Sequence, residues 1–346
     1  MRCHVNIPIF IPHLGCPHTC VFCNQRSISG AQSFDPADVD AQITAALATT
    51  CENDTAEIAY FGGSFTGIDR DRMVYLLDVA ERYVQKPLAG KARVAGIRMS
   101  TRPDYISDEI IEILARYSVR TVELGVQSMD DAVLTASGRG HDAESAAKAC
   151  RMLSDAGYDV IGQMMIGLPG STEESEVQTA RALCELGVRG ARIYPTVVFY
   201  DTPLCRMAQE GSYVPLSDGE AAQRSAEALR VFLQHGVPCI RIGLCASEQL
   251  TSSEKVFAGA NHPAMGEMVW NEYYYGQLLR AVHDGGLADK PLVLHIPVGD
   301  TSKVLGQHRC NALRVERKTG ARILRCREDA SLPHGTLLAC CASENI

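Results

Sequence analysis

The sequence predicts an α/β protein: a partial (β/α)6 barrel of the TIM type, followed by a small α/β unit near the C-terminal end. Short apolar segments rich in β-branched residues alternate with amphipathic helical segments over about 230 residues. An eight-unit barrel typically needs about 250 residues, so six units of about forty residues each fit better. Glycine-rich or cysteine-rich stretches follow the strands, at the end where such barrels keep their reactive groups.

The six units can be placed in order along the chain. The first strand, over residues 5–13, delivers a cysteine-rich loop at its end. The helix over residues 36–49 begins with Asp35 as N-cap, and Pro36 occupies the first helical position. The remaining strands are expected over residues 56–61, 94–99, 121–126, 160–166 and 191–198, and the remaining helices over residues 69–84, 107–117, 142–156, 172–186 and 217–235.

Composition narrows the classes of protein that fit. The 346 residues are 46% hydrophobic and 21% charged, which is typical of a globular protein and argues against extensive disorder. No apolar run approaches the length of about 18 residues that spans a bilayer. Pro8, Pro12 and His13 interrupt the apolar stretch near Met1, unlike a secretory signal, so we expect a cytoplasmic protein. The net charge of -8 gives no general attraction to nucleic acid or to an anionic membrane.

Three cysteines in one short loop carry the clearest chemical signal. Cys16, Cys20 and Cys23 have the spacing C-x3-C-x2-C, which presents three thiolates to one soft metal centre. A 4Fe-4S cluster usually takes four cysteines, so three of them imply an iron whose fourth partner lies elsewhere. The alternative is a zinc knuckle, in which protein ligands fill all four positions. The candidates for the fourth zinc ligand are Cys3, His13 and His18.

The cysteine loop resembles the defining motif of the radical SAM superfamily, in which S-adenosylmethionine chelates the open iron of the cluster. The resemblance implies that the reduced cluster cleaves S-adenosylmethionine and releases a 5′-deoxyadenosyl radical. It also implies an electron donor such as flavodoxin or ferredoxin. Phe22 stands where the family places an aromatic residue near the adenine. Gly62-Gly63-Ser64 resembles the family's glycine motif, which holds the amino group of the methionine moiety.

The sequence motifs at the ends of the later strands resemble those of one branch of that superfamily. Residues 97–106, residues 122–128 and the turn at residues 138–141 resemble the catalytic subunit of Elongator and, more distantly, oxygen-independent coproporphyrinogen III oxidase. The resemblance implies that Arg139 grips the carboxylate of S-adenosylmethionine, because a guanidinium binds a carboxylate through two parallel hydrogen bonds. The cofactor contacts implied are Phe22, Gly62, Gly63, Ser64, Ser100, Gln127, Arg139, Ile166 and Gly167.

Some positions depart from that branch or keep two interpretations. Ser100 and Gln163 stand where the oxidase type carries a glutamate and an aspartate. Tyr194 is either a radical relay or substrate contact, or simply a packed ring. His262 and Glu267 are either substrate contacts or ordinary loop residues. The glycine-rich loop with which the Elongator subunit's acetyltransferase domain would cradle acetyl-CoA has no counterpart in this sequence.

The C-terminal segment is basic. Between residues 301 and 327 there are eight Lys or Arg residues and one acidic residue, a local balance of 8 - 1 = +7. Strands over residues 292–296 and 321–325, with helices over residues 301–305 and 310–318 between them, resemble a KH-type RNA-binding module. In that module a G-x-x-G loop clamps single-stranded nucleotides. The RNA-binding candidates are Lys303, Gly306, Gln307, His308 and Arg309, and Arg309 replaces the second glycine of the loop.

These observations predict a barrel over residues 1–240, a cap or linker over residues 241–290 and a basic module over residues 291–346. The function expected first is radical SAM modification of an RNA base, in tRNA, with a 4Fe-4S cluster and S-adenosylmethionine as cofactors. One alternative is a radical SAM enzyme for a small molecule such as a porphyrin precursor, with the tail serving assembly. The other is an RNA-binding protein whose cluster is structural or redox-sensing.

Overall fold

The computed structural model describes residues 3–11, 14–16, 20–24, 34–244 and 254–342. Its largest sheet has seven strands, all parallel, in the order β1-β2-β3-β4-β5-β6-β8. The strands are β1 (His4–Phe10), β2 (Thr55–Phe61), β3 (Arg93–Thr101), β4 (Val119–Gln127), β5 (Asp159–Ile166), β6 (Gly190–Pro195) and β8 (Cys239–Ile242).

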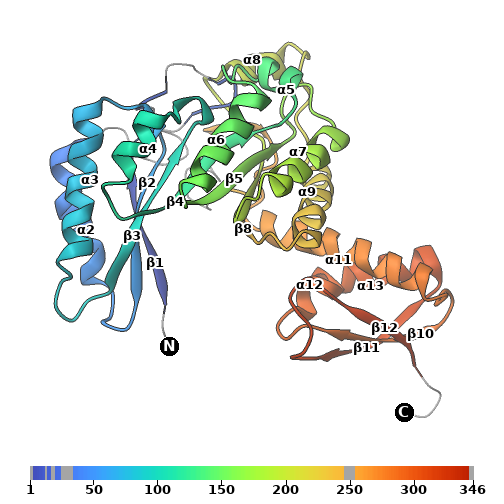
Figure 1. Ribbon diagram of the computed structural model, residues 1–346. Coiled ribbons are helices and arrows are strands. Elements are labelled where there is room, and N and C mark those ends of the chain that lie inside the picture. The colour runs from blue at the N-terminus through green and yellow to red at the C-terminus, as the bar shows by residue number, and fades with distance from the viewer. Residues whose placement is uncertain (1–2, 12–13, 17–19, 25–33, 245–253, 343–346) are drawn as a thin grey trace.

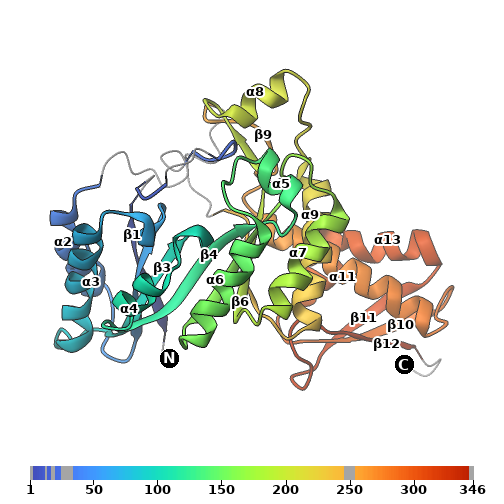
Figure 2. The ribbon, with the colours of Figure 1, turned by 45° about the horizontal axis from the view of Figure 1, so that its top comes forward.

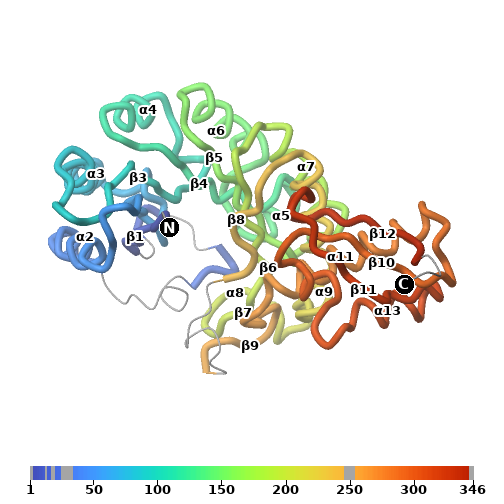
Figure 3. The backbone as a smooth tube through the Cα atoms, turned by 90° about the horizontal axis from the view of Figure 1, so that it is seen from below, coloured from blue at the N-terminus to red at the C-terminus, as the bar shows by residue number. Residues whose placement is uncertain are grey.

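Helices connect these strands and cover the outer side of a curved sheet (Figures 1 and 3). They are α2 (Val39–Ala48), α3 (Arg70–Gln85), α4 (Asp108–Leu114), α5 (Asp131–Ala136), α6 (Ala143–Asp155), α7 (Glu173–Glu185), α8 (Pro203–Gln209) and α9 (Asp218–Gln234), with short 3-10 turns η1 (Pro36–Asp38), η2 (Phe65–Gly67) and η3 (Pro103–Tyr105). The predicted partial barrel is therefore confirmed, with one additional strand.

Alternation along the strands divides the residues between two faces. In β3, Ile97 and Met99 are fully buried in the core, where Leu76 of α3 is also buried. Each such side chain contributes about 1.5–3 kcal/mol to the stability of the fold by leaving water. Arg98, between Ile97 and Met99, points to the opposite face and bonds Glu123 of β4. The helices thus cover an apolar face, and the inner face of the curved sheet carries charge.

The structure corrects two details of the barrel. The strand expected over residues 191–198 ends at Pro195, and β7 (Val197–Phe199) instead pairs antiparallel with β9 (Val256–Gly259). Strand β8 was not predicted, because four residues with Arg241 among them give little periodicity. Helix α8 lies beyond the C-terminal ends of the parallel strands, as Figure 2 shows. Residues 12–13 of the expected first strand lie outside the described part of the chain.

A second unit follows the barrel. Its sheet has the order β11-β10-β12, with β10 parallel to β11 and antiparallel to β12. The predicted strand-helix-helix-strand order is present, and the last strand and helix α11 are additions. The elements are α11 (Met265–Asp284), β10 (Pro291–Ile296), α12 (Thr301–Leu305), η4 (Gln307–Arg309), α13 (Cys310–Thr319), β11 (Arg322–Glu328) and β12 (Leu338–Cys341).

Helix α11 joins the two units. It packs against α9 of the barrel and against α12 and α13 of the second unit (Figure 1). The expected boundaries after residues 240 and 290 stay a prediction. Among the described residues, none of the helices is both long and apolar enough to cross a membrane.

Candidate functional site

The cysteine loop is held at the C-terminal end of the sheet by contacts with distant segments. The Val21 amide donates to Ser137 O at 3.1 Å, and the Leu204 amide of α8 donates to Val21 O at 2.9 Å. Phe22 packs against the cluster formed by Val198, Leu204, Cys205 and Tyr213. Cys20 is buried, whereas Cys16 and Cys23 are half-buried. Two of the three thiols therefore face partly outward from an anchored loop.

The glycine motif packs directly against that loop. The Ser64 amide donates to Leu14 O at 2.9 Å, and Ser64 Oγ lies 3.5 Å from Cys16 Sγ. A Cβ atom on Gly63 would lie 2.2 Å from Leu14 O, and one on Gly15 would lie 2.2 Å from Ser64 O. Only glycine permits this approach of two backbones. The motif thus has a packing role, and its predicted contact with the methionine amino group stays a prediction.

Two buried guanidinium groups surround the sulfur of Cys20. Arg139 Nη1 lies 3.3 Å and Arg102 Nη1 lies 3.9 Å from Cys20 Sγ. Arg102 is fixed by two hydrogen bonds of 2.9 Å to Asp104 and by a bond to the Arg139 carbonyl, and Arg139 also donates to Gly125 O. Cationic donors this close stabilise negative charge on sulfur. Arg139 was predicted and Arg102 was not.

Several buried polar atoms here have no hydrogen-bond partner among the described residues: Gln127 Oε1, Arg139 Nε and His141 Nδ1. His141 Nδ1 lies 3.8 Å from Asp104 Oδ1, which is too far for a hydrogen bond. Gln127 also has a φ of 69°, in the left-handed region that favours glycine. Strain and unsatisfied polar atoms together are typical of ligand sites. Burial, assisted by the Arg139 charge, lowers the pKa of His141 to about 4, so this imidazole is neutral at physiological pH.

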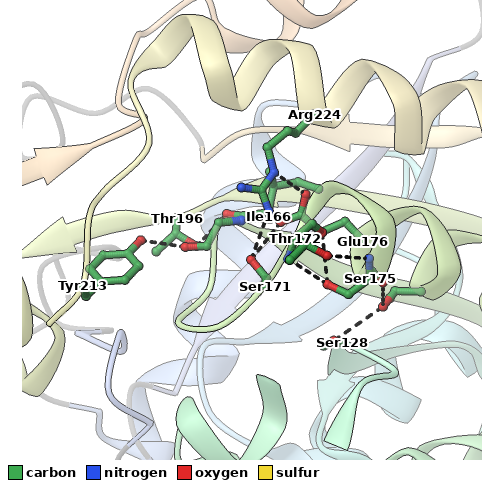
Figure 4. Close-up of polar contacts among 11 residues, drawn as sticks. Ser128, Ile166, Ser171, Thr172, Ser175, Glu176, Thr196, Tyr213 and Arg224 are labelled. Carbon is green, nitrogen blue, oxygen red and sulfur yellow. Dashed lines mark hydrogen bonds and ion pairs between the residues drawn. The ribbon is translucent and has the colours of Figure 1, made fainter. Parts of the chain in front are cut away.

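The turn after β5 is held by side chains that the sequence did not single out (Figure 4). Glu176 Oε1 accepts from the Gly167 amide at 2.6 Å, and Arg224 Nε and Nη2 donate to Glu176 at 2.8 and 2.6 Å. Tyr213 OH donates to Gly167 O at 2.6 Å, and burial raises the pKa of Tyr213 to about 12, so the hydroxyl keeps its proton. The Thr196 amide and Oγ1 both donate to Ile166 O, at 2.9 and 2.7 Å.

These bonds bear on the predicted cofactor contacts of Ile166 and Gly167, whose turn resembles the one that meets the adenine in the superfamily. The Ile166 carbonyl and both backbone groups of Gly167 already have partners within the protein. Any adenine contact at this turn must therefore share these groups or use neighbouring ones. The predicted roles of Ile166 and Gly167 stay predictions, and the structure assigns Glu176, Arg224 and Tyr213 to the support of the turn.

A polar network lines the inner face of the barrel. Arg98 Nε and Nη1 contact Glu57 and Glu123 at 3.0 and 2.9 Å, and Arg192 Nη2 contacts Glu123 at 2.6 Å. Glu123 is fully buried and also accepts from Gln163 Nε2 at 2.8 Å. Ser100 is the ladder partner of Glu123 on the same face. Arg192 Nη1 donates to Tyr194 OH at 3.2 Å, so Tyr194 is part of this network.

One sequence signal would have found the network. Five consecutive strands, β2 to β6, each carry a long polar or charged side chain in their interior, with apolar residues beside it: Glu57, Arg98, Glu123, Gln163 and Arg192. Alternation places such residues on one face of a sheet. Burying four charges there requires that they pair, as they do.

The predicted RNA-binding loop lies between α12 and α13. Gly306 has a φ of 74°, and His308 and Arg309 also have positive φ, of 51° and 60°. Arg309 therefore holds the left-handed conformation that glycine would adopt at little cost. Gln307, His308 and Arg309 are exposed, but Arg309 Nη2 donates to Ile323 O at 2.9 Å and Lys303 Nζ contacts Asp300 at 3.3 Å.

The remaining candidates are dispersed. His262 is exposed, and its amide donates to Asp218 at 3.0 Å, while its Nδ1 accepts from the Ala264 amide at 3.1 Å. Glu267 is exposed on the first turn of α11. Of the alternative zinc ligands, Cys3 is exposed, and His13 and His18 lie outside the described residues.

Comparison with known proteins places the chain in a family. The family model of the Radical SAM superfamily matches residues 10–183, half of the chain, and the Radical_SAM C-terminal domain matches residues 188–274. The chain therefore belongs to the radical SAM superfamily and is a radical SAM enzyme. Its cofactors are those of the superfamily, a 4Fe-4S cluster and S-adenosylmethionine.

The relatives are similar over different lengths. An uncharacterized protein of Methanocaldococcus jannaschii is 29% identical over 262 residues, which cover 72% of this chain and 77% of that protein. A tRNA uridine(34) acetyltransferase of Methanocaldococcus infernus is 27% identical over 60% of this chain and 46% of its own length. The solved structure of Elp3 from Methanocaldococcus infernus aligns with a TM-score of 0.60 at 20% identity, covering 82% of this chain and 63% of the other. The chain thus spans about half of that acetyltransferase.

The residues at the strand ends fit these cofactors. In the described part of the chain, no three His, Cys, Asp or Glu side chains gather closely enough to bind a single metal ion. Three thiols on one loop and two cationic donors beside Cys20 suit an anionic cluster. The unsatisfied Arg139 Nε is a donor for a carboxylate, and the unsatisfied Gln127 Oε1 is an acceptor for an N–H or O–H group of a ligand.

Proposed function

We propose that this radical SAM enzyme modifies a base of an RNA, with tRNA as the first candidate, in the cytoplasm. The observation that carries the RNA assignment is the basic surface of the C-terminal unit. Six cationic side chains there are exposed: Arg309, Arg317, Lys318, Arg322, Arg325 and Arg327. Of these, Arg322 pairs with Glu316 at 3.3 Å and Arg309 donates to Ile323 O. Exposed cations release counterions when they meet phosphates, and this is the main source of non-specific RNA affinity. The names of the relatives that act on tRNA uridine support the same target.

In this proposal Cys16, Cys20 and Cys23 would hold the cluster. When reduced, the cluster would supply the one electron that cleaves S-adenosylmethionine into methionine and a 5′-deoxyadenosyl radical. The residues proposed to hold S-adenosylmethionine are Phe22, Gly62, Gly63, Ser64, Ser100, Gln127, Arg139, Ile166 and Gly167. Arg139 has an unsatisfied Nε, and Gln127 has an unsatisfied Oε1. Each therefore has a hydrogen-bonding position left for the cofactor, Arg139 as a donor and Gln127 as an acceptor. The electron is proposed to come from a flavodoxin or ferredoxin.

The basic unit over residues 291–346 is proposed as the RNA-binding domain of the chain. In its loop at residues 306–309, Gly306 is buried and the other three residues are exposed, and positive φ angles constrain the backbone, which suits a fixed backbone clamp. Arg309 keeps further donors beyond the one that reaches Ile323 O, because a guanidinium has five N–H groups. Arg309 thus places a cation at the loop position where the KH-type module has its second glycine.

The test is anaerobic incubation of the reconstituted enzyme with S-adenosylmethionine, a reductant and total RNA, followed by digestion and mass spectrometry of the nucleosides. We expect a new modified nucleoside that is absent when Cys20→Ala replaces the wild-type enzyme. Cleavage of S-adenosylmethionine without any change in the RNA would contradict the proposal. It would direct attention to a small-molecule substrate.

A further inference from the structure

A groove of about 400 Å³ lies between the edge of the barrel and the C-terminal unit. Its walls come from strand β8 of the barrel, from the first turns of α11 and from Lys303 of α12 in the C-terminal unit. Figure 1 shows where these elements lie. Arg241 and Lys303 contribute positive charge, Glu267 contributes negative charge, and Trp270 contributes an aromatic ring. None of these residues takes part in the predicted cofactor site.

Both cations have hydrogen-bonding capacity to spare. The Lys303 ammonium lies 3.3 Å from Asp300 Oδ1, which leaves two of its three N–H donors. Asp300 is buried and is satisfied by Tyr274 OH and His334 Nδ1, each at 2.5 Å from Oδ2. The Arg241 side chain has no carboxylate within ion-pair distance among the residues that the structure describes. Two cations therefore face one groove with only part of their charge compensated.

The aromatic wall is held in place from behind. Trp270 is the single tryptophan of the chain and is half-buried. Its ring centroid lies 4.3 Å from that of His334 and 5.4 Å from that of Tyr273, and Lys303 Nζ lies 5.7 Å from its ring centroid. A supported indole beside two cations combines the two elements that bind single-stranded nucleotides: a stacking surface and a phosphate contact.

We propose that this groove binds one nucleotide of the substrate RNA, with its phosphate between Arg241 and Lys303 and its base against Trp270. This inference rests on the proposed function, because it takes RNA as the substrate. Guanidinium and ammonium groups suit a phosphate, and Glu267 suits a ribose hydroxyl or an exocyclic amine. The groove also gives the cationic tail a second point of contact with RNA, at the barrel itself.

Position favours an RNA strand over a free nucleotide. Lys303 precedes the proposed clamp at residues 306–309 by three positions, so a strand held by that loop passes close to the groove. Arg241 is the ladder partner of Arg192, which belongs to the charged network inside the barrel. The groove thus lies between the RNA-binding loop and the inner face of the barrel.

The fluorescence of the single tryptophan provides a direct assay that needs neither cofactor turnover nor a known modification. The purified holoenzyme is titrated with a short oligoribonucleotide, with adenosine 5′-monophosphate and with adenosine. We expect the oligoribonucleotide to quench Trp270 and to bind most tightly, the monophosphate to bind more weakly and adenosine to have the least effect. Arg241→Gln and Lys303→Gln should each weaken oligoribonucleotide binding by about tenfold.

Lys148→Gln is the matched control, because Lys148 is an exposed cation of helix α6 on the barrel that neither lines the groove nor belongs to the basic surface of the C-terminal unit. We expect it to change the affinity by less than about twofold. Circular dichroism melts verify that the variants fold. If Arg241→Lys keeps oligoribonucleotide binding and Arg241→Gln weakens it, the loss of the positive charge, and not a loss of folded structure, explains the weaker binding.

The outcomes separate the two proposals. The proposal that the groove binds RNA fails if the oligoribonucleotide causes no quenching, or if quenching survives both glutamine variants. In either case the nucleoside assay still decides the proposed function. Monophosphate binding as tight as oligoribonucleotide binding identifies a free-nucleotide site and overturns the RNA assignment of the groove. Quenching with the expected variant effects supports the groove even where no modified nucleoside is found.

Discussion

The substitution Glu176→Gln tests whether the turn after β5 depends on a buried ion pair. Glu176 is 3% exposed and its partner Arg224 is 17% exposed, and Glu176 accepts from the Gly167 amide, Ser171 Oγ and two Arg224 nitrogens. Burial raises the pKa of Glu176, while Arg224 and the Gly167 amide act in the opposite direction. Glutamine keeps the shape but leaves the Arg224 charge buried without a counter-charge.

Breaking a buried pair in this way costs about 3–5 kcal/mol. The matched control is Glu144→Gln, because Glu144 also pairs with an arginine from a helix, but the two side chains of that pair are 81% and 53% exposed. An exposed pair contributes about 0–1 kcal/mol. The free energy of unfolding should therefore fall by about 3 kcal/mol or more in Glu176→Gln and by less than about 1 kcal/mol in Glu144→Gln.

Urea denaturation followed by circular dichroism measures both values. With a slope of about 3 kcal/mol per M urea, the Glu176→Gln midpoint falls by about 1 M. The same variant should bind S-adenosylmethionine more weakly but keep its iron content, because neither Glu176 nor Arg224 makes a hydrogen bond to Cys16, Cys20 or Cys23 among the described residues. Equal midpoints for the two variants would refute the assignment of Glu176 as the buried support of this turn.

Three further predictions concern the site. Cys20→Ala should abolish iron binding after reconstitution, while the exposed Cys51→Ser keeps it, and iron retained in Cys20→Ala would contradict the ligand assignment. Arg102→Met should lower the midpoint potential of the cluster by about 50 mV, because a cation near Cys20 stabilises the reduced cluster. A redox titration followed by electron paramagnetic resonance measures the potential. An unchanged potential would count against a role of Arg102 beside the cluster. The pKa of His141 is about 4 in the folded protein against an ordinary 6.5, so folding favours the neutral imidazole. The free energy of unfolding should therefore be unaffected by His141 above pH 6.5 and should fall by about 3 kcal/mol between pH 6.5 and pH 4, because the unfolded chain takes up a proton there and the folded protein does not. Urea midpoints measured across that range should show this loss in the wild type and lack it in His141→Gln.

Much of the fold could be predicted because local signals agreed with the final structure. The Asp35-Pro36 start marks a helical segment that the structure contains. The helices expected from residues 107 and 172 are also present, and in the structure Ser107 and Thr172 are their N-caps. Helix α11 escaped prediction because Ala264 at its N-cap makes no side-chain hydrogen bond, and Gly266 and Gly276 weaken its helical pattern.

The candidate site divides in a similar way. The cysteine loop and the glycine motif are each a single short stretch of sequence, so the spacing of their residues is enough to locate them. Arg102 reaches Cys20 across 82 positions, and Arg224 reaches Glu176 across 48. Contacts between such distant positions depend on how the barrel brings its strand ends together, which a single sequence does not encode in any local pattern.

The central claim is that this chain uses a cluster on Cys16, Cys20 and Cys23 to cleave S-adenosylmethionine. The most direct measurement is anaerobic reduction of the reconstituted protein with S-adenosylmethionine and RNA present, with quantification of 5′-deoxyadenosine by mass spectrometry. We predict that 5′-deoxyadenosine accumulates with the wild-type protein and not with Cys20→Ala. A wild-type protein that carries a reduced cluster and binds S-adenosylmethionine, yet forms no 5′-deoxyadenosine, would contradict the account.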